Sequence, residues 1–513
     1  MKDNSIYSQV IVSKTGISIP VFKNGKTVDS RYDPERESLR IYEQIKPETS
    51  FVIVAGIASG VLINTIIKNR PGCFVLAVEI SDDDIEFLSD LSLIKELKQN
   101  RQICFCSIQK LAEKIIQNYI PSFYGSFEVI EQRGWSLENQ AYLEQIKLII
   151  QKAIGIVSAD FSVQSHFGKL WTFNIFSNIR QIEKCSGLQT QNFPTDKTAA
   201  ILAAGPTLDT TIQKLLKKRR DYYIIATDTA LSVCVSYKLI PDAVISLDGQ
   251  QVSGTHFIHG ETFDLSDTLF LFDLSANEVS VKKAFTDNGK VCFFTSGHPL
   301  SNFINSEYNL CLPELFSGSG TVTISAVDFA IKAGFNSIQV FGADFAYSKG
   351  KPYTKGTYLD RLYNIKANRL EPSQKSFCRL EYRTELIKLS HGVFTTQILN
   401  AYKESFEEYL TGLGIEVKKD EDIYILKNGH NSNNFSKLNK PNADVSGTKI
   451  VQEIIKQFEK PNDLLNSIYD LTKSDICLLP LISWLRNNDN IDKKDFKYYY
   501  NKAIKICTSL GGN

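Results

Sequence analysis

The chain has 513 residues, and its 58 lysines and arginines against 57 aspartates and glutamates give a formal net charge of +1. At about 150 residues per domain, this length predicts two to four domains, and the 43% of apolar residues suffices for several hydrophobic cores. The near-zero charge argues against a general nucleic-acid binder, because such proteins usually carry a surplus of basic residues.

The sequence predicts neither a membrane span nor a secretory signal. Its longest apolar run, residues 51–63, falls short of the roughly 20 residues that a span needs, and the N-terminus has no apolar core flanked by small residues. The ten cysteines form no C-x-x-C pair and mostly lie in apolar runs, as buried free thiols do in a reducing compartment. We therefore expect a cytoplasmic protein.

Residues 51–79 have the pattern of a Rossmann-like unit, with a strand, a small-residue turn, a helix and a second strand. The turn is Gly56–Gly60, and the second strand ends in Glu79. In nucleotide-binding folds, such a turn holds a phosphate and such an acid holds a ribose. The turn reads G-x-x-x-G rather than G-x-G-x-x-G, so a nucleotide site and a role in packing alone both remain open.

Between residues 196 and about 430, short apolar strands alternate with helical segments. This alternation predicts a doubly wound, mostly parallel sheet with helices on both faces. The expected strands are AAILAA, YYIIAT, AVISLD, TLFLFD, VCFFT, SIQVFG and DIYILK. Before them, residues 162–184 read as one long helix, on which Asn174 and Asn178 share a face.

These patterns divide the chain into four parts. We expect a Rossmann-like N-terminal domain (1–160), a helical linker (161–195), an α/β domain (196–432) and a helical C-terminal domain (433–513).

Small residues and acids follow the strands of the α/β domain at their carboxyl ends, where parallel sheets bind ligands. The turn Gly205-Pro206-Thr207-Leu208 follows the first strand and suits a phosphate or nucleotide at the start of a helix. Thr227-Asp228 and Asp248-Gly249 follow the next two strands. The two acids suit a ribose, an acceptor or a metal, and Asp228 also suits a helix N-cap.

Two later strand ends are rich in small residues, Ser296-Gly297 and Ser317-Gly318-Ser319-Gly320. The second leads into a helix, so its N–H groups suit a carboxylate or a phosphate. The last main strand ends at Asp344 and is followed by a loop with three tyrosines, whose hydroxyls can donate to a leaving phosphate without adding charge. These tyrosines are Tyr347, Tyr353 and Tyr358.

The histidines give weaker signals. His256-x-x-His259 resembles half of a metal site, but no third ligand has the spacing of one, so we expect no metal. His391 precedes an expected helix, 396–410, and an uncrowded histidine can titrate near neutral pH and act as a base.

Five segments, taken in order, resemble the motility accessory factor (Maf) glycosyltransferases, whose central domain is also found in the MptE-like 6-hydroxymethylpterin diphosphokinase. They are AAGPTLD, IIATDTAL, IPDAVISLDGQ, SGSGTVTISAVDFAIKAGFNSIQVFGADFAY and KGKPYTKGTY. The resemblance covers most of the chain. It implies transfer of a nonulosonic acid, of pseudaminic, legionaminic or sialic-acid type, from its CMP-activated form to Ser or Thr hydroxyls of flagellin.

The central domain also resembles bacterial sialyltransferases that use CMP-sialic acid. This likeness implies inversion at the anomeric carbon, no metal or other cofactor, tyrosines that hold the departing phosphate and a histidine near His391. Together with the strand-end residues, it gives five catalytic candidates, Asp228, Asp248, Tyr347, Tyr353 and His391. The donor-binding candidates are Gly205, Pro206, Thr207, Leu208, Thr227, Gly249, Ser296, Gly297, Ser317, Gly318, Ser319, Gly320, Asp344 and Tyr358.

Two other functions remain open. The first is a pterin diphosphokinase that uses ATP and Mg²⁺, with Asp228 and Asp248 as metal ligands. The second is a non-catalytic flagellin-binding factor.

Overall fold

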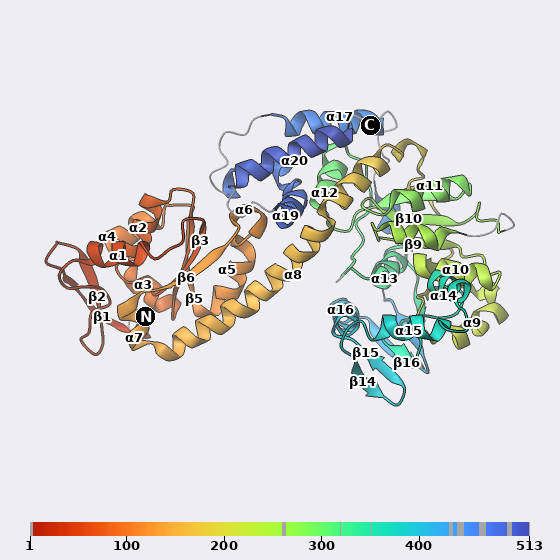
Figure 1. Ribbon diagram of the computed structural model, residues 1–513, viewed down its shortest axis with the longest axis horizontal. Helices are drawn as coiled ribbons and strands as arrows, with labels where there is room; N and C mark the ends of the chain where they lie inside the picture. The colour runs from red at the N-terminus through yellow and green to blue at the C-terminus, as the bar shows by residue number, and fades with distance from the viewer. Residues whose placement is uncertain are drawn as a thin grey trace. The chain divides into compact units, whose positions relative to one another are not determined.

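The computed structural model describes residues 4–258, 263–318, 320–348, 350–429, 434–438, 446–460, 468–489 and 495–511. Contacts between residues divide the chain into two compact units (Figure 1). The first comprises Met1–Lys169 and Lys456–Ser509, and the second comprises Leu170–Ile455 and Leu510–Asn513. The tail from Lys456 therefore shares a unit with the N-terminal residues, whereas the sequence suggested a separate helical domain from 433.

A four-stranded parallel sheet, in the order β5-β4-β3-β6, forms the centre of the first unit. Every residue of β3 and β4 is buried, as expected for inner strands covered on both faces. Since the chain runs from β3 to β4 and β5 on one side and returns to β6 on the other, the strand order reverses between β3 and β6. The strands are β3 (Phe51–Ala55), β4 (Phe74–Glu79), β5 (Ile103–Ser107) and β6 (Phe127–Glu131).

The expected strand–turn–helix–strand unit is confirmed, with α2 (Val61–Asn69) between β3 and β4. An antiparallel hairpin precedes it, and helices surround the sheet. The other elements of this unit are β1 (Tyr7–Val12), β2 (Ser18–Phe22), α1 (Pro34–Tyr42), α3 (Asp82–Leu88), α4 (Ser92–Leu97), α5 (Leu111–Asn118), α6 (Pro121–Tyr124), α7 (Arg133–Glu138), α18 (Lys473–Ile476), α19 (Leu479–Asn488) and α20 (Phe496–Gly511).

The helix expected over residues 162–184 is part of a longer one, α8 (Gln140–Ile179), which contributes residues to both units. It ends five residues earlier than expected, because the chain tightens after Arg180 into a 3₁₀ turn, Ile182–Lys184. No helix among the described residues combines the length and the apolar character that crossing a membrane requires.

An eight-stranded sheet, in the order β11-β10-β9-β8-β7-β12-β17-β16, forms the centre of the second unit. Its first six strands are parallel, and β17 and β16 add an antiparallel hairpin at one edge. All seven expected strands are present. The strands are β7 (Thr198–Leu202), β8 (Tyr222–Thr227), β9 (Ala243–Ser246), β10 (Leu269–Asp273), β11 (Lys290–Phe294), β12 (Ser337–Phe341), β16 (Glu416–Asp420) and β17 (Ile423–Lys427).

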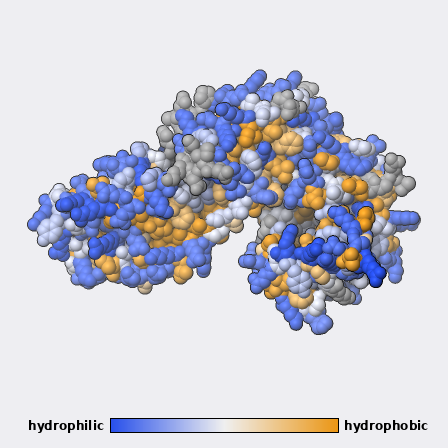
Figure 2. Space-filling model, in the orientation of Figure 1, coloured by the Kyte–Doolittle hydropathy of each residue, from blue (hydrophilic) through white to orange (hydrophobic). Residues whose placement is uncertain are grey.

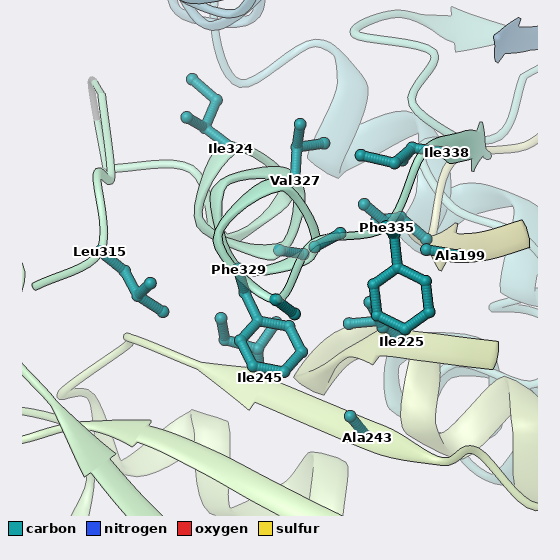
Figure 3. Close-up of a cluster of buried hydrophobic side chains, with 14 of the residues drawn as sticks. Ala199, Ile225, Ala243, Ile245, Leu315, Ile324, Val327, Phe329, Phe335 and Ile338 are labelled. Atoms are coloured by element: carbon teal, nitrogen blue, oxygen red, sulfur yellow. The ribbon is translucent and has the colours of Figure 1, made fainter. Parts of the chain in front are cut away.

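Helices cover both faces of this sheet, which confirms the doubly wound α/β fold. On one face, α13 (Val322–Lys332) packs Val327 and Phe329 against Ile225 and Ile245 of the strands (Figure 3). Along β7, Ala199 and Ile201 belong to this cluster, while the alternate residues Ala200 and Leu202 are equally buried on the other face.

The remaining helices follow the strands, and a small antiparallel sheet, β13-β15-β14, lies after β12 in the chain. The face drawn in Figure 2 is mostly hydrophilic, with hydrophobic side chains interspersed. These elements are α9 (Leu208–Lys217), α10 (Asp228–Ser236), α11 (Glu278–Thr286), α12 (Pro299–Glu307), β13 (Tyr347–Ser348), α14 (Tyr358–Lys366), α15 (Ser373–Glu381), β14 (Ile387–Ser390), β15 (Val393–Thr395), α16 (Gln397–Gly412) and α17 (Gly447–Phe458).

Candidate active site

The strand order of the central sheet reverses between β7 and β12, and ligands of open α/β sheets bind beyond the carboxyl ends at such a point. The turn from Gly205 to Leu208 follows β7, and the segment from Gly342 to Asp344 follows β12. The Gly205 N–H donates to the Gly342 carbonyl at 2.9 Å, so the two segments are joined. The sequence motifs and the strand order thus both indicate a ligand site at the carboxyl ends of β7 and β12.

Asp344 fills the Gly205 turn. Its Oδ2 accepts the Thr207 N–H at 3.2 Å, and burial raises the pKa of this carboxyl. A Cβ on Gly205 would lie 2.0 Å from Asp344 Oδ2 and 2.4 Å from the Gly342 carbonyl oxygen, so only glycine fits. In this structure, the protein's own carboxylate takes the helix N-terminus that the sequence suggested for a phosphate. Pro206 and Leu208 of the same turn are buried.

The tyrosine-bearing loop is docked on this turn. The Thr354 N–H donates to the Ala204 carbonyl at 3.0 Å. Asp209, in the first turn of α9, accepts the Thr354 hydroxyl and the Lys355 N–H, the latter at 2.8 Å. These bonds fix the neighbouring Tyr353 relative to the switch point.

Tyr353 lies in a group of tyrosines from three elements. Although 36% of its surface is exposed, burial of the ring raises its pKa to about 12, and the charges of Tyr347, Tyr358 and Tyr402 act in the same direction. Tyr347 lies on β13, Tyr358 begins α14, and Tyr402 lies on α16. Tyr402 could not be identified from the sequence, because a tyrosine inside an ordinary helix belongs to no motif.

Asp228 is buried, and both of its oxygens are engaged. Oδ1 accepts the Thr229 N–H at 2.6 Å and its hydroxyl at 3.1 Å, while Oδ2 accepts the Ser246 hydroxyl at 2.7 Å. Ser246 ends β9 and Asp228 begins α10, so this carboxylate ties two neighbouring strand ends together. The N-cap of α10 is Thr227 and not Asp228 as the sequence suggested, but the hydrogen bonds of Asp228 still favour a structural role.

Asp248 is half-buried, and its charge acts on two of the tyrosines. Burial raises the pKa of Tyr402, and the Asp248 charge raises it further. The same charge also raises the pKa of Tyr358, after burial and Tyr363. One Asp248 oxygen, Oδ1, accepts the Gln250 N–H at 2.9 Å. Of the two predicted acids, Asp248 is therefore the one placed with the tyrosines.

His256 lies beside these acids, in the 3₁₀ segment Gln251–Phe257 after β9. Its ring packs edge-to-face against Tyr358 with centroids 4.7 Å apart. Burial lowers the pKa of His256, while the charges of Asp228 and Asp248 act to raise it. From the sequence, His256 was considered only as one of two possible metal ligands, His256 and His259. The second of these, His259, lies outside the described residues.

The turn before α13 is more open than the Gly205 turn. Gly318 and Gly320 have φ angles of +54° and +90°, and a Cβ on Gly320 would meet no atom within 4 Å. The N–H groups of Gly320 and Thr321 donate to Ser317, and α13 has no side-chain cap. Ser319 lies outside the described residues.

Three other donor-binding candidates have structural partners. The Thr227 hydroxyl donates to the Leu202 carbonyl at 3.1 Å. A Cβ on Gly249 would lie 3.0 Å from Asn174 Nδ2. Ser296 hydrogen-bonds to the buried Asp273. Gly297, by contrast, has a φ of +107° and open space around it.

His391 lies at the exposed turn between β14 and β15, ahead of α16, whose N-cap is Thr396. His391 is not among the groups whose charges act on Tyr353 or Tyr358. The described residues also contain no group of three or more His, Cys, Asp or Glu arranged to hold a metal ion.

The turn Gly56–Gly60 of the first unit is filled by protein groups. A Cβ on Gly56 would lie 2.5 Å from the Trp135 ring. Glu79 accepts the Trp135 indole N–H at 2.6 Å, the Tyr7 hydroxyl at 3.0 Å and the Ile57 N–H at 3.2 Å. These contacts favour packing as the role of this turn.

A cavity of about 460 Å³ lies elsewhere in this unit, near the ends of β4 and β5. No charged side chain lines it, so it is unsuited to an anionic nucleotide. Its lining residues are Ile80, Ile108, Gln109, Ala112, Tyr142, Gln145 and Ile149.

Comparison with known proteins gives three kinds of relative. Residues 173–350 match the family described as "6-hydroxymethylpterin diphosphokinase MptE-like". Two uncharacterized proteins of Treponema pallidum (strain Nichols) are 38% and 33% identical to the chain over 148 and 150 residues, 29% of this chain in each case. The matches span 70% of the first relative and 53% of the second.

The solved "Structure of MAf glycosyltransferase from Magnetospirillum magneticum AMB-1" aligns with 100% of this chain and 87% of its own, at 12% identity and a TM-score of 0.45. The MptE-like domain expected from the sequence motifs is confirmed by the match to residues 173–350. The chain belongs to the family of the 38%-identical Treponema pallidum protein and carries an MptE-like domain in its second unit.

Proposed function

We propose that the chain is a Maf-type glycosyltransferase, which moves a nonulosonic acid from a CMP-activated donor to Ser or Thr hydroxyls of flagellin. One observation carries the proposal. The bond from Thr354 to Ala204 docks the loop of Tyr353 at the point where the strand order of the parallel sheet reverses, and the charges of Tyr358, Tyr402 and Asp248 act within the same group of residues. Flagellin and the CMP-sugar are the partners, and the reaction requires no metal or other cofactor.

Loss of the CMP phosphate is the first requirement of such a transfer. The donor carbon develops positive charge as its bond to the phosphate oxygen breaks, and hydrogen-bond donors stabilise the departing anion. Tyr347 and Tyr353 are protonated at neutral pH, as tyrosines ordinarily are, and burial raises their pKa values further, so both hydroxyls can donate. The turn before α13 suits the sugar carboxylate, because Gly320 has open space around it beside a helix N-terminus that no side chain caps.

Orientation of the acceptor hydroxyl is the second requirement. The charge of Asp248 acts on two of the tyrosines, whereas the oxygens of Asp228 are bonded to Thr229 and Ser246. Asp248 is therefore the acid that would lie beside the acceptor hydroxyl and stabilise the positive charge of the group that takes its proton.

The test is transfer by the purified full-length chain, read as intact mass of flagellin after incubation with CMP-pseudaminic and CMP-legionaminic acid. We expect flagellin to gain the mass of whole sugar residues, with and without EDTA. The double variant Tyr347→Phe/Tyr353→Phe should lose at least 100-fold in turnover, while the exposed Tyr382→Phe serves as its control. No mass gain with either donor, and no stabilisation by CMP, would overturn the proposal.

A second function is favoured by the description of the matched family, a pterin diphosphokinase that uses ATP and Mg²⁺. Asp228 and Asp248 would then be the metal ligands. Thermal unfolding with CMP, CDP and ATP plus Mg²⁺ separates the alternatives. Stabilisation by CMP supports sugar transfer, stabilisation by ATP with Mg²⁺ supports the kinase, and no shift supports a non-catalytic flagellin-binding factor.

A further inference from the structure

We propose that His256 is the base of the transfer reaction, the group that takes the proton from the acceptor hydroxyl. This inference rests on the proposed transferase function and adds to it a residue that the motifs did not assign. The His256 side chain lies in the 3₁₀ segment Gln251–Phe257, which follows β9 in the chain.

The His256 ring is held tightly but is not saturated with hydrogen bonds. Only 7% of the residue is exposed, and its ring lies edge-on to Tyr358. Its Nδ1 is buried and has no hydrogen-bond partner among the described residues. Buried polar atoms of folded proteins are usually hydrogen-bonded, so an unpartnered one calls for an explanation. Nδ1 of His256 retains an unused capacity to accept a hydrogen bond from a hydroxyl that reaches it.

Four ionisable groups face His256 from three directions. Asp228 lies on α10, Asp248 precedes the 3₁₀ segment, and Tyr358 and Arg361 lie on α14. Burial and Arg361 disfavour the imidazolium, whereas the two carboxylates favour it. The ring is consequently neutral near neutral pH and can accept a proton. Once it is charged, Asp228 and Asp248 stabilise it.

The step balances with groups already described. The acceptor oxygen forms a bond to the anomeric carbon of the donor, and the bond from that carbon to the phosphate oxygen breaks. The electron pair of the broken bond leaves with CMP, which the tyrosines receive. The acceptor proton moves to Nδ1 of His256 and passes to solvent after CMP has left. No oxidant, reductant or metal enters the balance.

The other histidine near this region fits the role less well. His391 occupies an exposed hairpin turn, while His256 lies against Tyr358 and responds to the charge of Asp248. A base must lie within hydrogen-bond reach of the proton that it takes. Of the two, His256 is the one placed at the acid–tyrosine cluster.

The experiment compares His256→Gln, His256→Ala and His391→Gln in the full-length chain, with His166→Gln, an exposed histidine of α8, as the matched control. We expect His256→Gln to lower kcat by about 100-fold or more, as for loss of a general base, with donor KM within about threefold. The acid limb of its pH–rate profile should disappear. Added imidazole should restore part of the activity of His256→Ala, and stabilisation by CMP should persist in both variants, showing that they fold.

A kcat within threefold of wild type in His256→Gln, or a loss confined to His391→Gln, would overturn the role of His256 while leaving the transferase function standing. A retained acid limb in a slowed but CMP-binding His256→Gln would also overturn it. No transfer by the wild-type chain overturns the function, and with it this inference.

Discussion

The Thr207 N–H donates to Oδ2 of Asp344 at 3.2 Å and thereby links the first residues after β7 to those after β12. A second bond, from the Gly205 N–H to the Gly342 carbonyl, joins the same two segments, so both hold together the point where the strand order reverses. The Gly205 turn thus supports the tyrosine loop, which is hydrogen-bonded to Ala204 and Asp209 beside it.

Gly205→Ala tests the close fit of this turn. The new methyl group would meet the Asp344 carboxylate and the Gly342 carbonyl, so the turn must shift, and overpacking of this kind costs about 1–3 kcal/mol. Urea unfolding should show this loss in Gly205→Ala. Gly412→Ala is the control, because a Cβ there meets no atom within 4 Å in a helix. Equal stability of the two variants would contradict the close fit.

Asp209→Ala tests the docking of the tyrosine loop. It removes the acceptor for the Thr354 hydroxyl and the Lys355 N–H, which frees the segment next to Tyr353. We expect kcat for sugar transfer to fall about tenfold or more, and hydrogen exchange of residues 350–357 to become faster.

Lys351→Met provides the comparison for Asp209→Ala. It removes only an ion pair, 3.6 Å long and partly exposed, and pairs of this kind contribute about 0–1 kcal/mol. Its exchange rates and kcat should stay within threefold of wild type. An effect equal to that of Asp209→Ala would show that the ion pair with Lys351, and not the hydrogen bonds of Asp209, holds the tyrosine loop.

Two asparagines of α8 give a matched pair for the Asp248 segment. Asn174 Nδ2 donates to the Gly249 and Ser275 carbonyls, each at 3.0 Å, while Asn178 Nδ2 donates to the carbonyls of Leu274 and Ala276. Asn174→Ala should lower stability and also slow transfer, because Gly249 follows Asp248.

Asn178→Ala should cost similar stability, about 1–3 kcal/mol, with kcat within threefold of wild type, since it holds only the end of β10 and the residues after it. Chemical denaturation and steady-state transfer assays measure both effects. Equal loss of kcat in the two variants would show that the effect comes from stability alone.

The inner strands of both sheets could be predicted from the sequence, because inner strands of parallel sheets are continuous apolar runs. FVIVA of β3 and YYIIAT of β8 are examples. The strand β16 could not, because it lies at the sheet edge, all of its residues are exposed, and four of the five in EVKKD are charged. Local signals thus identify the core of the sheet better than its margin.

The site was only partly predictable for a different reason. Gly205 and Asp248 follow strands and can be located by counting along the chain. That Asp344 occupies the Gly205 turn, and that His256 and Tyr402 lie near Asp248, depends on which segments the fold brings together. Such contacts between distant residues leave no spacing in the sequence.

Glu79 is buried among Tyr7, Trp135 and the turn after β3. Burial raises its pKa from 4.5 to about 7, and burial likewise raises that of the nearby Asp29 to about 6. Because the folded state holds these protons more tightly than the unfolded state, the stabilisation is fully present at low pH. It is lost as pH rises through the folded pKa values.

The free energy of unfolding of the first unit should therefore fall by about 2 kcal/mol between pH 5 and pH 8 from Glu79 alone. Urea unfolding monitored by Trp135 fluorescence, with Trp171 and Trp484 replaced by phenylalanine, measures it. In Glu79→Gln this fall should shrink to the part due to Asp29, whereas the exposed Glu48→Gln should retain the wild-type slope. A Glu79→Gln profile as steep as wild type would mean that Glu79 is already ionised at pH 5, and that its four hydrogen-bond donors outweigh its burial.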